Sequence, residues 1–185
     1  SGSAARSLYP GIVLLRADDR DILVETIAKD WPLELVVAVT DESAKAVSSS
    51  VAMLRSAATS PFYDAWVEQQ EQDIATALAA VRSRDFSALA DVAEHNCLKM
   101  HSLTWTSRPP VVYWNQGTMA CIQTVRDLQA DRVPVFFTID AGPQLKAVCL
   151  SDATRAVASA LEATPGVRRI LQSGLGAGAR RLSPT

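Results

Sequence analysis

A chain of 185 residues, 48% apolar and 21% charged, has the composition of a globular domain with enough apolar material for a core. Its net charge of −2 argues against nonspecific attraction to nucleic acid or anionic membranes, and no apolar run approaches the roughly 20 residues needed to span a bilayer. The three cysteines (Cys97, Cys121 and Cys149) fit no CxxC pattern and are expected to be buried free thiols of a reducing compartment. These features argue against a disulfide scaffold, a zinc module or a membrane protein.

The chain begins at Ser1, without a methionine and without a basic stretch followed by an apolar one, so no signal peptide is expected there. This start is a tag remnant, a processed end or an entry into the middle of a longer protein. The motifs described below favour the third interpretation.

Apolar periodicity predicts a mixture of helices and strands. Short β-branched runs predict strands at residues 12–15 and 33–39. Helical spacing then predicts three helices, over residues 61–83, residues 86–101 and residues 115–128, the last capped by Asn115.

The rest of the chain predicts a β-hairpin and one more helix. A strand over residues 133–139, a turn over 140–143 and a return strand over 145–150 are followed by a helix from Ser151 to Leu161 and a final strand at 166–171. Helices interspersed with antiparallel strands favour an α+β sandwich, with helices on one face of a sheet, over a parallel α/β fold.

A carboxylate follows the apolar strand VFFTI, as Asp140 of the sequence DAGP. Partial burial there would raise the basicity of Asp140, and the Gly-Pro pair fixes a tight turn that lets a ligand approach the backbone. The alternative is that Asp140 only begins an Asx-turn. Asp140 is therefore a candidate catalytic base that also has a purely structural interpretation.

Two further segments are candidate anion sites. Ser1, Gly2 and Ser3 enter a short helical stretch whose backbone N–H groups face an anion, and Arg6 adds a bidentate contact to a carboxylate or phosphate. The alternative is a flexible terminus. Ser49 lies in a run of three serines ahead of a helical pattern. That run is first of all an N-cap, and it also has the chemistry to hold a phosphate.

The histidines and aromatic residues favour structural roles. His95 and His101 lie six residues apart on one predicted helix and hence on different faces, so a shared metal ion is not expected. Trp105, Tyr113 and Trp114 flank the sequence RPP and are expected to close a core rather than to stack on a ligand.

Taken in order, these segments resemble the mevalonate diphosphate decarboxylases of the GHMP kinase superfamily. SGSAARSLYPG is similar to their second conserved block, AVSSSVAM to their serine segment and FFTIDAGPQ to their catalytic-aspartate block. TSPFYDAWV, RDFSALADVAEHNCLKMHSL and PPVVYW resemble their helical core and aromatic strand. The similarity runs from residue 1 to about residue 175, nearly the whole chain.

The resemblance implies an ATP-dependent decarboxylase that phosphorylates the 3-hydroxyl of mevalonate 5-diphosphate and releases phosphate and carbon dioxide, giving isopentenyl diphosphate. Asp140 matches the aspartate that acts on the 3-hydroxyl, and Arg6 matches the arginine that binds the substrate carboxylate. Ser1 and Ser3 match serines of the phosphate site around Gly2, and Ser49 matches a serine near the transferred phosphoryl group.

The implied fold is a GHMP kinase C-terminal-type domain over residues 21–185, with a four-stranded, mostly antiparallel sheet covered by helices. Residues 1–20 would end the N-terminal, ATP-binding, ribosomal S5-like domain. The resemblance also implies ATP and Mg²⁺ as cofactors, a cytoplasmic location and a homodimer, with no metal ligand assigned in this chain and no nucleic-acid or membrane partner.

Three departures from the family pattern leave a related substrate open: Pro10-Gly11, Val51-Ala52-Met53 and Gln144 stand where the family usually has other residues. The chain also lacks a glycine-rich phosphate loop, since its densest glycine stretch, residues 174–178, has no strand-loop-helix context. We therefore expect a C-terminal part of the enzyme that is inactive without its N-terminal half or a partner chain. The alternatives are a mevalonate-phosphate decarboxylase, a mevalonate 3-kinase or a non-catalytic domain.

Overall fold

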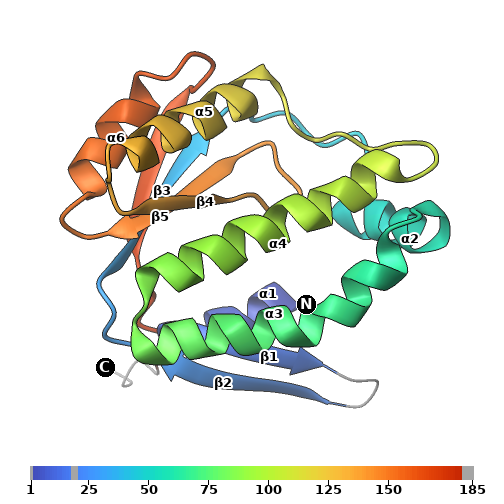
Figure 1. Ribbon diagram of the computed structural model, residues 1–185, viewed down its shortest axis with the longest axis horizontal. Coiled ribbons are helices and arrows are strands. Elements are labelled where there is room, and N and C mark those ends of the chain that lie inside the picture. Colours follow the sequence, from blue (N-terminus) through green and yellow to red (C-terminus); the bar gives the residue numbers. More distant parts are fainter. Residues whose placement is uncertain (1, 18–20, 181–185) are drawn as a thin grey trace, which may run out of the picture.

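The computed structural model describes residues 2–17 and 21–180 (Figure 1). Within them the chain forms six helices and six strands, in the order α1 (Gly2–Ser7), β1 (Ile12–Ala17), β2 (Ile22–Ala28), β3 (Leu33–Val39), α2 (Ser49–Thr59), α3 (Tyr63–Ser83), α4 (Phe86–Thr106), α5 (Gln116–Ala130), β4 (Val135–Thr138), β5 (Leu145–Leu150), α6 (Thr154–Glu162) and β6 (Arg169–Gly174).

The central layer is a four-stranded sheet in the order β4-β5-β3-β6, in which every neighbouring pair is antiparallel. β1 and β2 pair antiparallel in a separate two-stranded sheet. The predicted hairpin is confirmed, because β4 returns directly as β5 with Thr138 opposite Lys146. The expected α+β class and the expected four-stranded sheet are confirmed as well.

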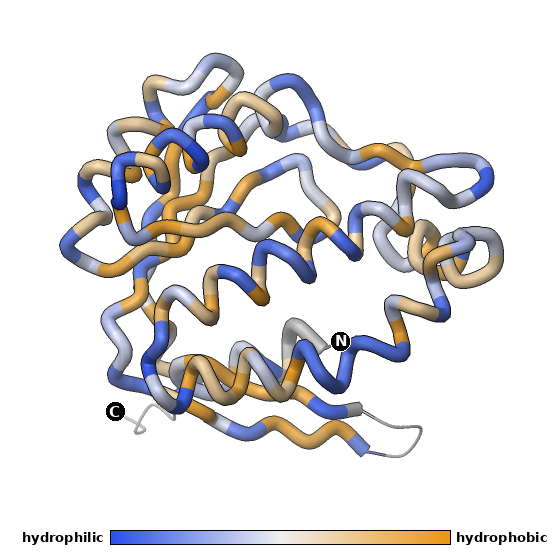
Figure 2. The backbone as a smooth tube through the Cα atoms, viewed as in Figure 1, coloured by the Kyte–Doolittle hydropathy of each residue, from blue (hydrophilic) through white to orange (hydrophobic). Residues whose placement is uncertain are grey.

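Helices cover both faces of this sheet, whereas the residue pattern had predicted helices on one face. α5 and α6 pack on one face, over a core of fully buried residues that includes Val36, Phe137 and Leu161. A second, smaller cluster containing Phe136 and Val148 joins the other face to α3, α4 and the β1–β2 hairpin. Apolar residues recur along the sheet strands and the inner sides of the helices (Figure 2).

The helices begin where short polar side chains are available to cap them. Ser48 accepts a hydrogen bond from the N–H of Val51 at the start of α2, and Asp85 accepts one from Ala88 at the start of α4. Asn115 caps α5 in a reciprocal capping box with Thr118, which confirms the cap predicted at Asn115.

Some elements have other bounds than predicted. α4 continues past residue 101 to Thr106. The hydroxyls of Thr104 and Thr106 donate hydrogen bonds to backbone carbonyls of the preceding turn, so these threonines do not break the helix. The final strand, β6, starts at Arg169 rather than at residue 166, after a turn that contains Gly166. β2 was not predicted, although its β-branched run is a strand signal.

The glycine stretch after β6 packs against the segment that precedes β1. The N–H of Gly11 donates to the carbonyl of Gly176 at 2.8 Å, and the N–H of Ala179 donates to the carbonyl of Leu8 at 3.0 Å. A side chain at Gly178 would meet the nitrogen of Pro10 at 2.8 Å. These glycines therefore allow two backbones to approach each other, and they do not form a phosphate loop.

Cys97, Cys121 and Cys149 are free and buried, as predicted. Burial raises the pKa of Cys121 to about 11 from its ordinary value of 9.0, because a thiolate loses its hydration in the core. None of the helices in the described part of the chain is both long and apolar enough to cross a membrane.

The raised pKa of Cys121 predicts a loss of stability in alkaline solution. Above pH 9 the unfolded chain ionises this thiol while the folded chain keeps it protonated, so the stability that the neutral thiol contributes disappears as the pH rises from 9 through 11. We expect the free energy of unfolding to fall by about 1 kcal/mol more between pH 8 and pH 10 in the wild-type protein than in Cys121→Val. Urea unfolding under reducing conditions measures both, and equal pH dependences would contradict this role of Cys121.

Candidate functional site

Asp140 lies directly after β4, at the start of the turn that returns as β5. The ammonium of Lys146 on β5 donates to Oδ2 of Asp140 at 2.7 Å. The register that pairs Thr138 with Lys146 brings this lysine beside the carboxylate. Sequence reasoning did not assign Lys146, although the predicted hairpin already placed it near Asp140.

The expectation that Asp140 is partly buried is wrong. Its side chain is 82% exposed, while the strand residues before it are buried. β4 ends at Thr138 and Ile139 is still fully buried, so the chain turns out of the core only at Asp140 itself. Asp140 therefore presents an ionisable oxygen on the surface of the described chain, where a ligand can reach it.

The turn after Asp140 is held rigidly by backbone and side-chain contacts. Gly142 has a φ of +91°, which only glycine adopts without strain, and a side chain there would meet Tyr113 at 3.3 Å. The carbonyl of Pro143 accepts a hydrogen bond from the hydroxyl of Thr118 at 2.6 Å. Gln144 accepts one from the N–H of Thr40 at 2.7 Å. The carboxylate of Asp140 thus projects from a fixed loop.

The serine segment is linked to this turn through Tyr113. Ser48 rather than Ser49 is the N-cap of α2, so the exposed hydroxyl of Ser49, in the first helical position, is left for other contacts. The hydroxyl of Tyr113 donates to the carbonyls of Val47 at 3.0 Å and Ser48 at 3.2 Å, and its Cβ lies beside Gly142. One side chain therefore fixes the start of α2 relative to the turn after Asp140.

The N-terminal segment belongs to a different part of the fold. Gly2, Ser3 and Arg6 lie on α1, which packs against β1 and β2, and the side chain of Arg6 is exposed. Ser1 lies outside the described residues. The structure therefore links the Asp140 turn to the serine segment directly, and it carries Arg6 on the separate hairpin layer.

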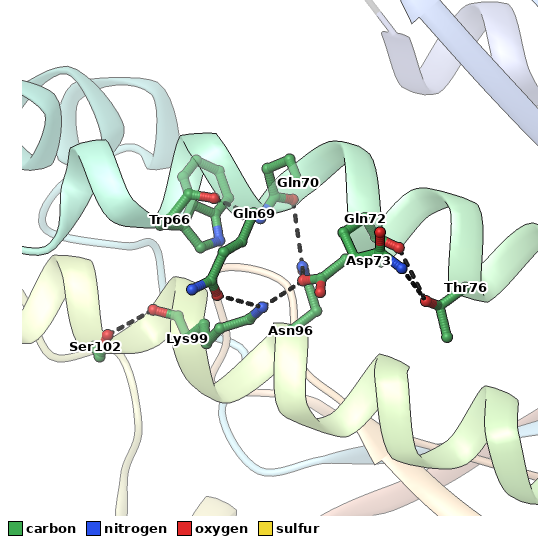
Figure 3. A network of polar contacts seen from close by, with 9 residues as sticks. All are labelled: Trp66, Gln69, Gln70, Gln72, Asp73, Thr76, Asn96, Lys99 and Ser102. Carbon is green, nitrogen blue, oxygen red and sulfur yellow. Dashed lines mark hydrogen bonds and ion pairs between the residues drawn. The ribbon is translucent and has the colours of Figure 1, made fainter.

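A cleft of about 370 Å³ borders Asp140 and extends between α3 and α4. Its far side is a polar network in which Asn96 donates to Asp73 at 2.7 Å and Lys99 forms an ion pair with the same carboxylate (Figure 3). Partial burial by itself would raise the pKa of Asp73, but the hydrogen bonds from Lys99 and Asn96 outweigh it and hold that pKa below its ordinary value. Both carboxylates of this cleft are paired, Asp73 with Lys99 and Asp140 with Lys146, but only Asp140 is largely exposed.

The aromatic residues after α4 divide between core and surface. The ring of Trp114 lies 4.8 Å from that of His101 in a tilted arrangement, and Trp114 packs against the main core, as predicted. Trp105 is 40% exposed and meets Trp114 edge-on, so the prediction that it closes the core is wrong. His95 is exposed and His101 is buried, which confirms that the two histidines lie on different faces of α4.

The described residues offer neither a cluster of metal-ligating side chains nor a free glycine-rich loop. Nowhere in residues 2–17 and 21–180 do three or more His, Cys, Asp or Glu side chains come together as metal ligands. The backbone of the glycine stretch after β6 is hydrogen-bonded to residues 8–11. The described acidic, histidine and cysteine side chains therefore supply no ready cluster of metal ligands, and the glycine stretch is not available as a phosphate loop.

The four-stranded antiparallel sheet packed with helices is a GHMP-kinase-type fold, and its turn between β4 and β5 carries the exposed carboxylate of Asp140. The family described as the mevalonate 5-diphosphate decarboxylase C-terminal domain matches residues 35–174. The chain belongs to this family.

Known proteins of this kind are similar to the chain in sequence and in structure. Diphosphomevalonate decarboxylase mvd1 of Aspergillus fumigatus is 29% identical over 176 residues, covering 90% of this chain and 44% of that protein. The structure described as MDDEF in complex with MVAPP, AMPPCP and magnesium is 30% identical with a TM-score of 0.87, covering 96% of this chain and 56% of the other.

The mevalonate diphosphate decarboxylase of Enterococcus faecalis, solved in work on its mevalonate diphosphate mediated ATP binding, is 29% identical with a TM-score of 0.84. That match covers 96% of this chain and 55% of the other. The chain therefore spans about half the length of the proteins it matches.

Proposed function

We propose that this chain is the C-terminal part of an ATP-dependent decarboxylase that converts mevalonate 5-diphosphate to isopentenyl diphosphate. The observation that carries the proposal is the exposed carboxylate of Asp140 on a firmly held turn, in a chain that the family matches over residues 35–174. A relative solved with MVAPP, AMPPCP and magnesium supports the choice of substrate and cofactors.

Asp140 is proposed to act on the tertiary 3-hydroxyl of the substrate. A carboxylate within hydrogen-bond reach of an alcohol orients it and accepts its proton as the oxygen becomes a nucleophile. The ammonium of Lys146 stays beside the carboxylate and fixes its direction. A rigid turn keeps the distance between carboxylate and hydroxyl constant, which contributes to the rate through orientation.

Arg6 is proposed to bind the substrate carboxylate, and the hydroxyls and backbone of Ser1, Gly2, Ser3 and Ser49 are proposed to bind its phosphate groups. A guanidinium pairs with a carboxylate through two parallel hydrogen bonds, so it fixes the orientation of the group that leaves as carbon dioxide. Serine hydroxyls and backbone N–H groups are donors that suit phosphate oxygens.

The complete enzyme is proposed to bind ATP and Mg²⁺ through residues that this chain does not supply, in an N-terminal half or a partner chain. We propose that the boundary between the two domains lies after residue 20, so that residues 1–20 belong to the ATP-binding half. β1 then belongs to that half and β2 to the C-terminal domain, and the hairpin that they form joins the two. A cytoplasmic location agrees with the three buried free thiols. A homodimer is proposed from family membership.

The test is an assay of the complete enzyme with ATP and Mg²⁺, measuring carbon dioxide and ADP. We expect one carbon dioxide per ADP from mevalonate 5-diphosphate and little release from the 5-phosphate. Release from the 5-phosphate alone would assign the monophosphate decarboxylase, and ADP without carbon dioxide would assign a 3-kinase. Neither product, with substrate bound, would mean a non-catalytic domain.

A further inference from the structure

β4 is an edge strand whose outer backbone groups are bonded by side chains instead of another strand. In the sheet order β4-β5-β3-β6, β4 has one paired edge, and α4 runs beside it (Figure 1). Buried N–H and C=O groups need partners, and a helix has no backbone donors or acceptors to offer sideways. Side chains of the neighbouring helices therefore have to supply the bonds that a fifth strand would make. Gln129 of α5 donates to the carbonyl of Val135 at 3.0 Å, and side chains of α4 supply the others.

Three residues on one face of α4 supply these bonds. Glu94 accepts a hydrogen bond from the N–H of Phe137 at 3.0 Å, and the sulfur of Cys97 accepts one from the N–H of Ile139 at 3.2 Å. Nε2 of His101 lies 3.0 Å from the carbonyl of Ile139. All three side chains are buried, and their spacing of three and four residues puts them in one row along the helix.

Bonding to Ile139 determines the state of His101. Two groups contact Nε2, the carbonyl of Ile139 at 3.0 Å and the Nε1–H of Trp114 at 3.3 Å. We assign the proton to Nε2, toward the shorter contact and a carbonyl that can only accept, which leaves buried Nδ1 as an acceptor without a partner among the described residues. The other tautomer would accept the longer bond from Trp114, but it would leave a buried Nδ1–H unbonded and aim a nitrogen lone pair at the carbonyl of Ile139. Burial lowers the pKa of His101, because a charged ring would lose its hydration. The carbonyls of Ile139 and Asp140 and the carboxylate of Asp140 raise this pKa by less, so the ring is neutral and Nε2–H acts as the donor.

We infer that His101 and Cys97 are positioning residues, which hold both backbone groups of Ile139 and so fix the point from which the Asp140 side chain projects. The inference rests on the proposed function of Asp140. The contacts of Gly142, Pro143 and Gln144 hold the chain after the aspartate, whereas His101 and Cys97 hold the residue directly before it. The carboxylate itself is 82% exposed, so its position depends on the backbone at both sides.

The test replaces His101 in the complete enzyme with two matched side chains. His101→Phe keeps a ring of similar shape without the Nε2–H donor, and His101→Gln keeps an N–H donor at similar reach. We expect Phe to lower kcat about 100-fold with KM for ATP unchanged, because a displaced catalytic group costs rate rather than nucleotide binding, and Gln to recover most of the loss. Cys97→Ala, which removes the partner of the Ile139 N–H, serves as the second variant if His101→Phe does not fold.

The same substitutions are made in an Asp140→Asn background. If His101 acts through Asp140, His101→Phe changes kcat less than about 3-fold once the carboxylate is gone. Leu103→Ala creates a cavity on the same helix and removes no polar group that could bond to Ile139, so it controls for general destabilisation and should leave kcat of the folded enzyme unchanged. A wild-type kcat in both His101→Phe and Cys97→Ala, or an equal loss in the Asp140→Asn background, overturns the inference. Wild-type turnover in Asp140→Asn alone would instead overturn the proposed role of Asp140.

Discussion

Replacing Asp140 with asparagine should reduce kcat of the complete enzyme about 1000-fold while leaving the fold intact. Asparagine has the same shape and still offers an oxygen to Lys146, but it has neither the negative charge nor the basicity needed to accept the proton of the 3-hydroxyl. Because the side chain is 82% exposed, the free energy of unfolding should change by less than about 0.5 kcal/mol. Steady-state carbon dioxide release and thermal unfolding measure the two effects separately.

Asp152→Asn is the matched control for this substitution. It removes one negative charge from another exposed aspartate, which follows the partner strand β5. Asp152→Asn loses the same surface charge as Asp140→Asn, but at a position outside the proposed chemistry. Its kcat should therefore equal that of the wild type. An Asp140→Asn enzyme that turns over at the wild-type rate would remove Asp140 from the proposed chemistry.

Replacing Arg6 with alanine should reduce kcat/KM for mevalonate 5-diphosphate by about 100-fold or more. The substrate carboxylate would lose a bidentate, charge-assisted partner, and the loss of one side of such a pair costs several kcal/mol. Arg6→Lys keeps the charge but loses the planar fork, so its kcat/KM should fall between those of the wild type and Arg6→Ala.

Arg155→Ala, an exposed arginine on α6, controls for the change in net charge and should leave kcat/KM unchanged. Circular dichroism of each variant shows whether α1 and the hairpin that it packs against remain folded. If Arg6→Ala binds and converts the substrate as the wild type does, another cation holds the carboxylate, and the proposed role of Arg6 is wrong.

The order of elements was readable from the sequence because it depends on local signals. Asn115 followed by an apolar helical pattern marked the start of α5, and the sequence DAGP between two apolar runs marked the turn between β4 and β5. The ordered segments around Asp140 and Ser49 also carried the resemblance that the match over residues 35–174 then confirmed. Periodicity did not reveal β2, whose partly exposed strand carries little burial signal.

The exposure of Asp140 was not readable in the same way. A strand of buried residues suggested that the following carboxylate would also be buried, but where a chain leaves the core depends on how far its neighbouring strands extend. The roles of Tyr113 and Gln144 were hidden for a related reason, since each holds the turn through contacts with residues far away in the sequence. Lys146 was within reach of prediction, because the hairpin register alone places it beside Thr138.

By itself the sequence determined the α+β class, the family and the identity of the candidate carboxylate, because caps, turns and apolar periods are properties of neighbouring residues. Only the tertiary structure decided that Asp140 is exposed, that Tyr113 ties its turn to the serine segment, and that His101 and Cys97 bond to Ile139. These bonds join residues that are 38 to 66 positions apart in the sequence. They form because α4 packs on the edge of β4 and Tyr113 packs against the serine segment. Long-range contacts of this kind have no local pattern, since they depend on the positions of whole elements in the folded chain.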